Sequence, residues 1–137
     1  MVDFQYASHY TVDDLRRIME ALRAPDGCPW DREQTHSSIR RNFLEETYEV
    51  LDAIDHDDAS GMCEELGDML FAAVRVASTL ERDPEQALHA ACEKFIRRFT
   101  AMEQTALAEG RPLETLSKDE LLAGWNAQKR VVPGGEQ

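Results

Sequence analysis

Apolar residues recur at spacings of three and four along most of the chain, which is the period of amphipathic helices. The first run follows Thr11 and Asp14, which have the spacing of a capping box, and it stops near the Pro-Asp-Gly turn at 25–27. No segment alternates with the period of two that strands require, and no internal repeat is present. The pattern therefore predicts an all-α fold.

Four further helices are predicted from the same period and from their caps: one from Asp31 to about Asp55, one from about Ala59 to Glu81, one from Pro84 to about Gly110, and a short one after a cap at Ser117–Glu120. We expect Asp31 to be an N-cap, with Gln34 three residues on, and a bend between Ser37 and Asn42. The expected architecture is an antiparallel bundle of about five helices, with one domain over residues 1–130 and a frayed tail over 131–137.

Each of the two central helices is predicted to bury one broad apolar face. At about 100° per residue, the face of the second helix comprises Phe43, Leu44, Tyr48, Val50, Leu51 and Ile54. The face of the third helix comprises Met62, Leu66, Met69, Leu70, Ala73, Val76, Ala77 and Leu80. These two sets are the expected core, and the short turn between the helices makes them neighbours.

The polar faces of the same two helices carry carboxylates. Glu46 and Glu49 are three residues apart, as are Glu65 and Asp68, so each pair lies about 5–6 Å apart at Cβ. Two unit charges about 4 Å apart repel by ~4 kcal/mol at an effective dielectric of about 20, so four converging carboxylates need a cation. Hard oxygen ligands select Mg²⁺, Mn²⁺ or Ca²⁺ over zinc. The alternative, a solvated acidic face, is not excluded by this spacing alone.

Basic and aromatic side chains form a second group of candidates. Lys94 and Arg98 lie one helical turn apart and either bind phosphate oxygens or pair with acidic neighbours on the surface. Trp125 and Lys129 have the same spacing in the last predicted helix, and Trp30 lies in a Gly-Cys-Pro-Trp-Asp loop. Either tryptophan can stack on a nucleobase or fill the core beneath it.

Composition narrows the classes of function. The chain has 137 residues and a formal net charge of −12, which disfavours nucleic acid as a partner because duplex affinity comes largely from Lys and Arg. No run approaches the roughly 20 apolar residues of a membrane span, so no membrane partner is expected. Three widely spaced cysteines without a Cys-x-x-Cys motif predict neither disulfides nor a zinc site, and they fit a reducing cytoplasm. A small anionic substrate remains compatible with the charge if a metal offsets it.

Six segments, taken in order, carry a more specific signal: Gly27–Asp31, Glu33–His36, Leu44–Asp52, Glu64–Phe71, Glu93–Phe99 and Trp125–Lys129. Together they resemble the MazG family of nucleoside triphosphate pyrophosphohydrolases over roughly residues 11 to 130. The resemblance implies an all-α fold in which a homodimer completes the helical bundle, with a tetramer as the alternative. It places the substrate cleft near the subunit interface.

The resemblance also implies roles for individual residues. The Mg²⁺ ligands are Glu46, Glu49, Glu65 and Asp68, with Mn²⁺ as a possible substitute ion. Glu45 would hold or activate water, and either Glu45 or Glu46 would take its proton. The phosphate-contacting pair is Lys94 and Arg98, and the C-terminal substrate-binding positions are Trp125 and Lys129. Trp30 is a further candidate for contact with the substrate.

The implied reaction is hydrolysis of a (deoxy)nucleoside triphosphate to the monophosphate and pyrophosphate by metal-activated water, in cytoplasmic nucleotide-pool housecleaning. One alternative is a narrower pyrophosphatase of the same superfamily, acting on dUTP, dCTP or phosphoribosyl-ATP. A second is a non-catalytic acidic helical module that binds a basic protein. Some family members carry two such domains in tandem whereas this chain shows one, so properties of a second domain do not transfer to it.

Overall fold

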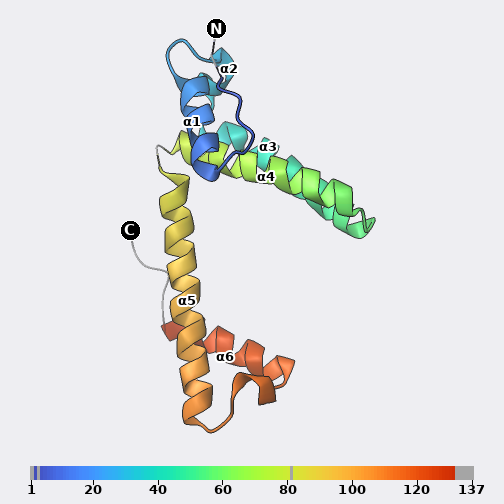
Figure 1. Ribbon diagram of the computed structural model, residues 1–137, viewed down its shortest axis with the longest axis vertical. Coiled ribbons are helices and arrows are strands. Elements are labelled where there is room, and N and C mark those ends of the chain that lie inside the picture. The colour runs from blue at the N-terminus through green and yellow to red at the C-terminus, as the bar shows by residue number, and fades with distance from the viewer. Residues whose placement is uncertain (1, 3, 81, 132–137) are drawn as a thin grey trace. The chain divides into compact units, whose positions relative to one another are not determined.

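The computed structural model describes residue 2 and residues 4–80 and 82–131, and within them it contains helices and no strand (Figure 1). The α-helices are α1 (Val12–Arg23), α2 (Pro29–Glu33), α3 (His36–Asp55), α4 (Ala59–Thr79), α5 (Pro84–Ala108) and α6 (Lys118–Val131), and a 3-10 helix η1 spans Leu113–Thr115. The all-α prediction is confirmed, with one short helix more than the sequence pattern indicated. None of the helices in the described ranges is long and apolar enough to cross a membrane.

The cap predicted for the first helix is present. The backbone N–H of Thr11 donates to Asp14 Oδ2 at 2.8 Å, and the N–H of Asp14 donates to Thr11 Oγ1 at 3.3 Å. At the other end of α1, the guanidinium of Arg23 donates to the backbone carbonyls of Asp31 and Gln34. This contact fixes the loop after α1 against the segment that leads into α3.

The prediction of Asp31 as an N-cap is wrong. Asp31 lies inside α2, whose N-cap is Cys28 and whose first residue is Pro29. α3 is capped instead by Thr35, whose side chain accepts from the N–H of Ser38 at 3.2 Å in a reciprocal box. The physical reason is tertiary, because the Asp31 carboxylate is buried against an arginine of α4 and is not available as a cap. α3 runs without interruption from His36 to Asp55, and Gln34 and Thr35 separate it from α2.

α3 and α4 lie side by side and are joined by a short turn at 56–58 (Figure 1). Asp58 caps α4 by accepting from the N–H of Gly61 at 3.0 Å. α1 packs against α4 and buries Met19. The buried residues of the hairpin are Ile39, Val50 and Ala53 of α3 and Ala72 and Val74 of α4.

Most of the predicted core of this hairpin is exposed in the single chain. In α3 the large exposed apolar side chains are Phe43, Leu44, Tyr48, Leu51 and Ile54. In α4 they are Leu66 and Leu70, and Leu80 at its C-cap is exposed as well, with exposed fractions between 38% and 62% for the whole set. The buried residues of the two helices include the small side chains Ala53 and Ala72, whereas the larger apolar side chains are exposed. Of the predicted core residues, Val50 is buried, whereas the buried Ile39, Ala53, Ala72 and Val74 were not part of the predicted faces.

The chain divides into two compact units, Met1–Ala87 and Leu88–Gln137, within the span that was predicted as one domain. The second unit contains α5 from Leu88 onward, η1 and α6, and it buries Met102 and Ala106. Gly110 follows α5 with a φ of 70°, and Ser117 and Glu120 form the predicted capping box of α6. The predicted end of the third helix at Glu81 and the predicted tail beyond Val131 lie outside the described residues.

Candidate metal centre and substrate site

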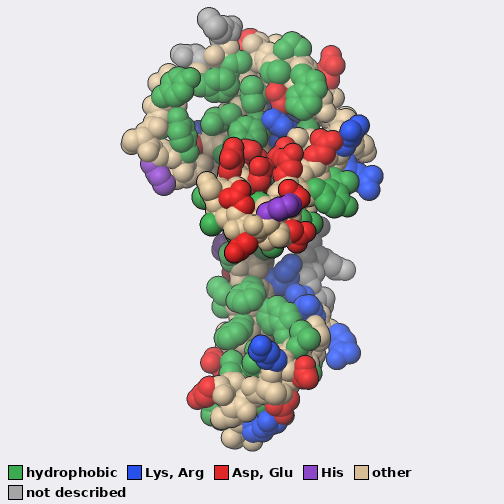
Figure 2. Space-filling view, turned by 90° about the vertical axis from the view of Figure 1, so that its right-hand side faces the viewer, with side chains coloured by type: hydrophobic (Ala, Val, Ile, Leu, Met, Phe, Trp, Pro, Cys, Tyr) green, Lys and Arg blue, Asp and Glu red, His purple; other side chains and the backbone are tan. Residues whose placement is uncertain are grey.

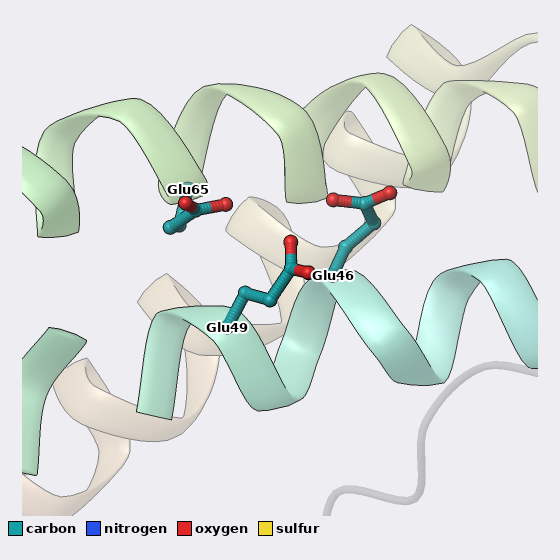
Figure 3. Close-up of side chains that lie close together, drawn as sticks. All are labelled: Glu46, Glu49 and Glu65. Carbon is teal, nitrogen blue, oxygen red and sulfur yellow. The ribbon is translucent and has the colours of Figure 1, made fainter. Parts of the chain in front are cut away.

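Three of the four predicted metal ligands converge between α3 and α4. Glu46 and Glu49 of α3 and Glu65 of α4 each offer a carboxylate oxygen, and these oxygens all lie within 4.8 Å of one another (Figure 3). Mg²⁺ holds oxygens at about 2.0–2.1 Å, so opposite ligands of one ion are about 4 Å apart. The donor set, all carboxylate oxygen, fits a hard divalent cation.

The electrostatics of the cluster favour a cation. Partial burial, followed by the negative charge of Glu49 and a hydrogen bond with it, raises the pKa of Glu65. A carboxyl group with a raised pKa is ionised less readily, and a bound cation reverses this by stabilising the ionised form. In Figure 2 acidic side chains gather in one patch of the first unit, with hydrophobic side chains exposed beside them.

Asp68, the fourth predicted ligand, lies outside this group of three. It is exposed on α4 and lines a groove of about 320 Å³ together with Asn42, Glu46, Phe71, Ala72 and Arg75. The negative charge of Asp68 is a further, smaller cause of the raised pKa of Glu65. A second groove, of about 330 Å³, opens beside Glu49 and Glu65 and is lined further by Asp52, Ala53, His56, Asp58 and Gly61.

Glu45, the candidate for activating water, also lies outside the cluster. Its Oε1 is 2.8 Å from Arg41 Nε, one turn earlier on the exposed side of α3. Glu45 precedes Glu49 by one helical turn, so the two side chains are neighbours on the helix surface. Glu46 is thus part of the ligand cluster, whereas Glu45 flanks it.

Two functional candidates were missed by the sequence reasoning. Asn42 Nδ2 donates to Glu46 Oε1 at 3.0 Å, and Arg75 Nη1 donates to Asn42 Oδ1 at 3.2 Å. Arg75 Nε lies 3.6 Å from Asp31 Oδ1. The sequence contains one feature that could have indicated Arg75: it is the single charged residue in the otherwise apolar run from Phe71 to Ala77 of α4.

Trp30 lies at the edge of the same network. The guanidinium carbon of Arg75 is 5.4 Å from the centroid of the Trp30 ring and 5.1 Å from that of Phe71. The Trp30 side chain remains 52% exposed, so one part of its ring is open to a ligand. The ring of Trp30 is therefore held in place by a cation from α4.

The remaining predicted residues belong to the second unit. Lys94 and Arg98 are partly buried and lie one turn apart on α5. Trp125 of α6 packs against Phe95, with ring centroids 5.3 Å apart, and the Nζ of Lys129 lies 5.9 Å from the centroid of Trp125. Trp125 thus packs against α5, the helix that carries Lys94 and Arg98, and Lys129 lies next to Trp125.

The model of the MazG nucleotide pyrophosphohydrolase domain matches residues 34–102, half of the chain. The chain belongs to the MazG family. The matched span contains Glu46, Glu49, Glu65 and Asp68 together with Lys94 and Arg98, whereas Trp30, Trp125 and Lys129 lie outside it. The resemblance seen in the sequence motifs is confirmed.

Curated relatives of this MazG domain support the same assignment. The nucleoside triphosphate pyrophosphohydrolase/pyrophosphatase MazG of Thermotoga maritima is 44% identical over 90 residues, which cover 63% of this chain and 35% of that protein. The nucleoside triphosphate pyrophosphohydrolase of Escherichia coli K12 is 38% identical over 123 residues, 86% of this chain and 44% of that protein. An uncharacterized protein of Bacillus subtilis, YabN, is 32% identical over 127 residues, 90% of this chain and 24% of that protein. The chain spans less than half the length of each of these relatives.

Proposed function

We propose that this MazG domain hydrolyses nucleoside triphosphates to the monophosphate and pyrophosphate, with Mg²⁺ held by Glu46, Glu49, Glu65 and Asp68. The convergence of three carboxylate oxygens within 4.8 Å, on two neighbouring helices, is the observation that carries the proposal. The names of the relatives from T. maritima and E. coli support the reaction. Mn²⁺ is the expected substitute ion, because it accepts the same oxygen ligands.

Different side chains of the first unit have different proposed roles in the reaction. Bound Mg²⁺ supplies Lewis-acid stabilisation of phosphate oxygens and lowers the pKa of water at the site. Glu46, Glu49 and Glu65 hold the ion, and Asp68 completes the ligand set from the adjoining groove. We assign Glu45 as the base that accepts a proton from the attacking water, because its carboxylate flanks the cluster and is not used as a ligand. Its ion pair with Arg41 holds the carboxylate in place beside the cluster.

The substrate is bound by cations and aromatic rings. Lys94, Arg98 and Lys129 are the proposed contacts to the phosphate groups, where fixed positive charge stabilises the pyrophosphate that leaves. Trp125 supports Lys129, since the two side chains are in contact. Trp30 is the proposed stacking surface for the base, because half of its side chain is exposed beside the groove.

The biological assembly proposed is a homodimer in which a second copy completes an antiparallel bundle, with a tetramer as the alternative. Large apolar side chains exposed on both α3 and α4 support this assignment, because monomeric proteins rarely leave such patches uncovered. The proposed setting is the cytoplasm, where the free thiols of Cys28, Cys63 and Cys92 stay reduced. The proposed role there is removal of unwanted nucleotides from the pool.

A nucleotide panel with Mg²⁺, scored separately for pyrophosphate and orthophosphate, tests the reaction. The panel contains the common ribo- and deoxynucleoside triphosphates, dUTP, oxidised nucleotides and phosphoribosyl-ATP. Release of pyrophosphate from several triphosphates is the expected result. Turnover of a single compound would instead favour the narrower pyrophosphatase. Release of orthophosphate alone would overturn the proposed chemistry. Absence of both turnover and Mg²⁺ binding would instead favour the non-catalytic acidic module.

A further inference from the structure

Arg75 is a charged side chain held between the loop after α1 and the metal centre. Its side chain is only 20% exposed, and it lies against the rings of Trp30 and Phe71. Removing a guanidinium from water is costly unless opposite charge and hydrogen bonds compensate. The opposite charge is that of Asp31, whose side chain is 9% exposed and whose Oδ1 lies 3.6 Å from Arg75 Nε. The hydrogen bond is made with the side-chain amide of Asn42.

The contact with Arg75 fixes which way the Asn42 amide faces. A guanidinium has donors and no acceptor, so only the amide oxygen of Asn42 can face it. That oxygen accepts from Arg75 Nη1 at 3.2 Å, and the amide nitrogen must then point the other way. It donates to Glu46 Oε1 at 3.0 Å, across one turn of α3. The orientation of the amide, ambiguous for an isolated asparagine, is thus set by the arginine.

This arrangement has a direct consequence for the ligand cluster. With Oε1 of Glu46 engaged by Asn42, the carboxylate is held in one orientation while it offers an oxygen to the cluster. Arg75 is also the one cation among the residues that line the groove shared by Glu46 and Asp68. It therefore offsets part of the negative charge beside the cluster without contacting the ligand oxygens itself.

We propose that Arg75 is a positioning residue that orients the metal ligand Glu46 through Asn42 and couples it to the loop bearing Trp30 and Asp31. The inference rests on the proposed metal site and goes beyond it, since neither Arg75 nor Asn42 is a ligand. It links an aromatic substrate contact at Trp30 to the metal ligand by one unbroken chain of contacts. Distortion of that chain lowers affinity for the ion before it alters the helices.

The test measures binding of Mn²⁺ to the nucleotide-free protein, by titration followed through the electron paramagnetic resonance signal of the free ion. Competition by Mg²⁺ then gives the affinity for the natural candidate ion. We expect Arg75→Met and Asn42→Ala each to weaken binding by about 10-fold or more, as loss of a residue supporting a metal ligand does. The double variant should be little weaker than the stronger single variant, because both changes break one chain of contacts.

Three controls separate positioning from stability. Arg75→Lys keeps the charge and a donor and should recover part of the lost affinity. Arg16→Met removes an arginine of α1 that pairs with Asp13 and Glu20, so it should lower the melting temperature and leave Mn²⁺ binding unchanged. Asn42→Ala provides the test on its own if Arg75→Met fails to fold, because Asn42 lies on the partly exposed side of α3.

The possible failures are distinguishable. If the unaltered protein binds neither Mn²⁺ nor Mg²⁺, the proposed metal site is wrong. If it binds them and both Arg75→Met and Asn42→Ala bind with unchanged affinity, the metal site stands and the positioning role is overturned. A lower melting temperature of both variants with unchanged dissociation constants would likewise show that Arg75 and Asn42 are only structural.

Discussion

Glu49 of α3 and Glu65 of α4 place carboxylate oxygens within 4.8 Å of each other across the two helices. Partial burial and the charge of Glu49 raise the pKa of Glu65. In the absence of a cation, the neighbouring carboxylate therefore makes ionisation of Glu65 less favourable. If the proposed cation binds here, we expect it to stabilise the hairpin. Local strain of this electrostatic kind is typical of functional sites.

Glu49→Gln should abolish both Mg²⁺ binding and pyrophosphate release while leaving the helix content intact. A ligand present at 100 times its dissociation constant adds ~2.7 kcal/mol of stability, and this increment should vanish in the variant. Without Mg²⁺ the variant should be at least as stable as the unaltered protein, because one repulsive charge is gone. Thermal unfolding followed by circular dichroism, with and without Mg²⁺, measures both effects. Asp55→Asn removes a charge near the end of the same helix and serves as the control.

Gly27 and Gly67 should respond to alanine in opposite directions. A Cβ at Gly27 would lie 2.3 Å from the backbone oxygen of Leu22, so Gly27→Ala should destabilise the protein by about 1–3 kcal/mol. At Gly67, within α4, a Cβ meets nothing within 4 Å, and alanine should stabilise the helix by up to ~1 kcal/mol. Urea unfolding gives both free energies. Equal effects at the two positions would contradict the tight packing around Gly27.

Glu120 should stabilise the second unit in a pH-dependent way. The backbone N–H and the hydroxyl of Ser117 and the guanidinium of Arg111 lower the pKa of Glu120 to about 2, against 4.5 for the free side chain. Because the folded pKa is the lower one, this stabilisation is complete above pH 4.5 and is lost as the pH falls towards 2. The difference in melting temperature between the unaltered protein and Glu120→Gln should therefore narrow below pH 4.5.

The exposed apolar face of the α3–α4 hairpin should control association. Ile54 is 51% exposed on α3, and Leu70 is 56% exposed on α4. If a second copy covers this face, Ile54→Glu and Leu70→Glu should weaken the dimer by at least about tenfold, since a buried unpaired charge costs more than 1 kcal/mol at an interface. Sedimentation equilibrium measures the dissociation constant, with Ser60→Glu as a charge-matched control. A monomeric unaltered protein would refute the proposed assembly.

Local interactions made much of the fold predictable. The boxes at Thr11–Asp14 and Ser117–Glu120 involve residues three apart, so their geometry follows from the helix start itself. The prediction failed at Asp31, where a contact with Arg75 of α4 outweighed the local capping signal. The prediction of the core also failed, because a helical period indicates which residues share an apolar face but not which surface covers that face.

The sequence alone determined the family, the all-α class and the pairing of Glu46 with Glu49 on one helix, because helical spacing follows from covalent geometry and backbone hydrogen bonds. Only the tertiary structure decided that Glu65 joins that pair while Asp68 lies in the adjoining groove. It alone revealed that Arg75 reaches Asn42, 33 residues earlier in the chain. Distances between helices depend on how each helix is rotated against its neighbour, and that rotation is set by the packing of small buried side chains rather than by any local spacing.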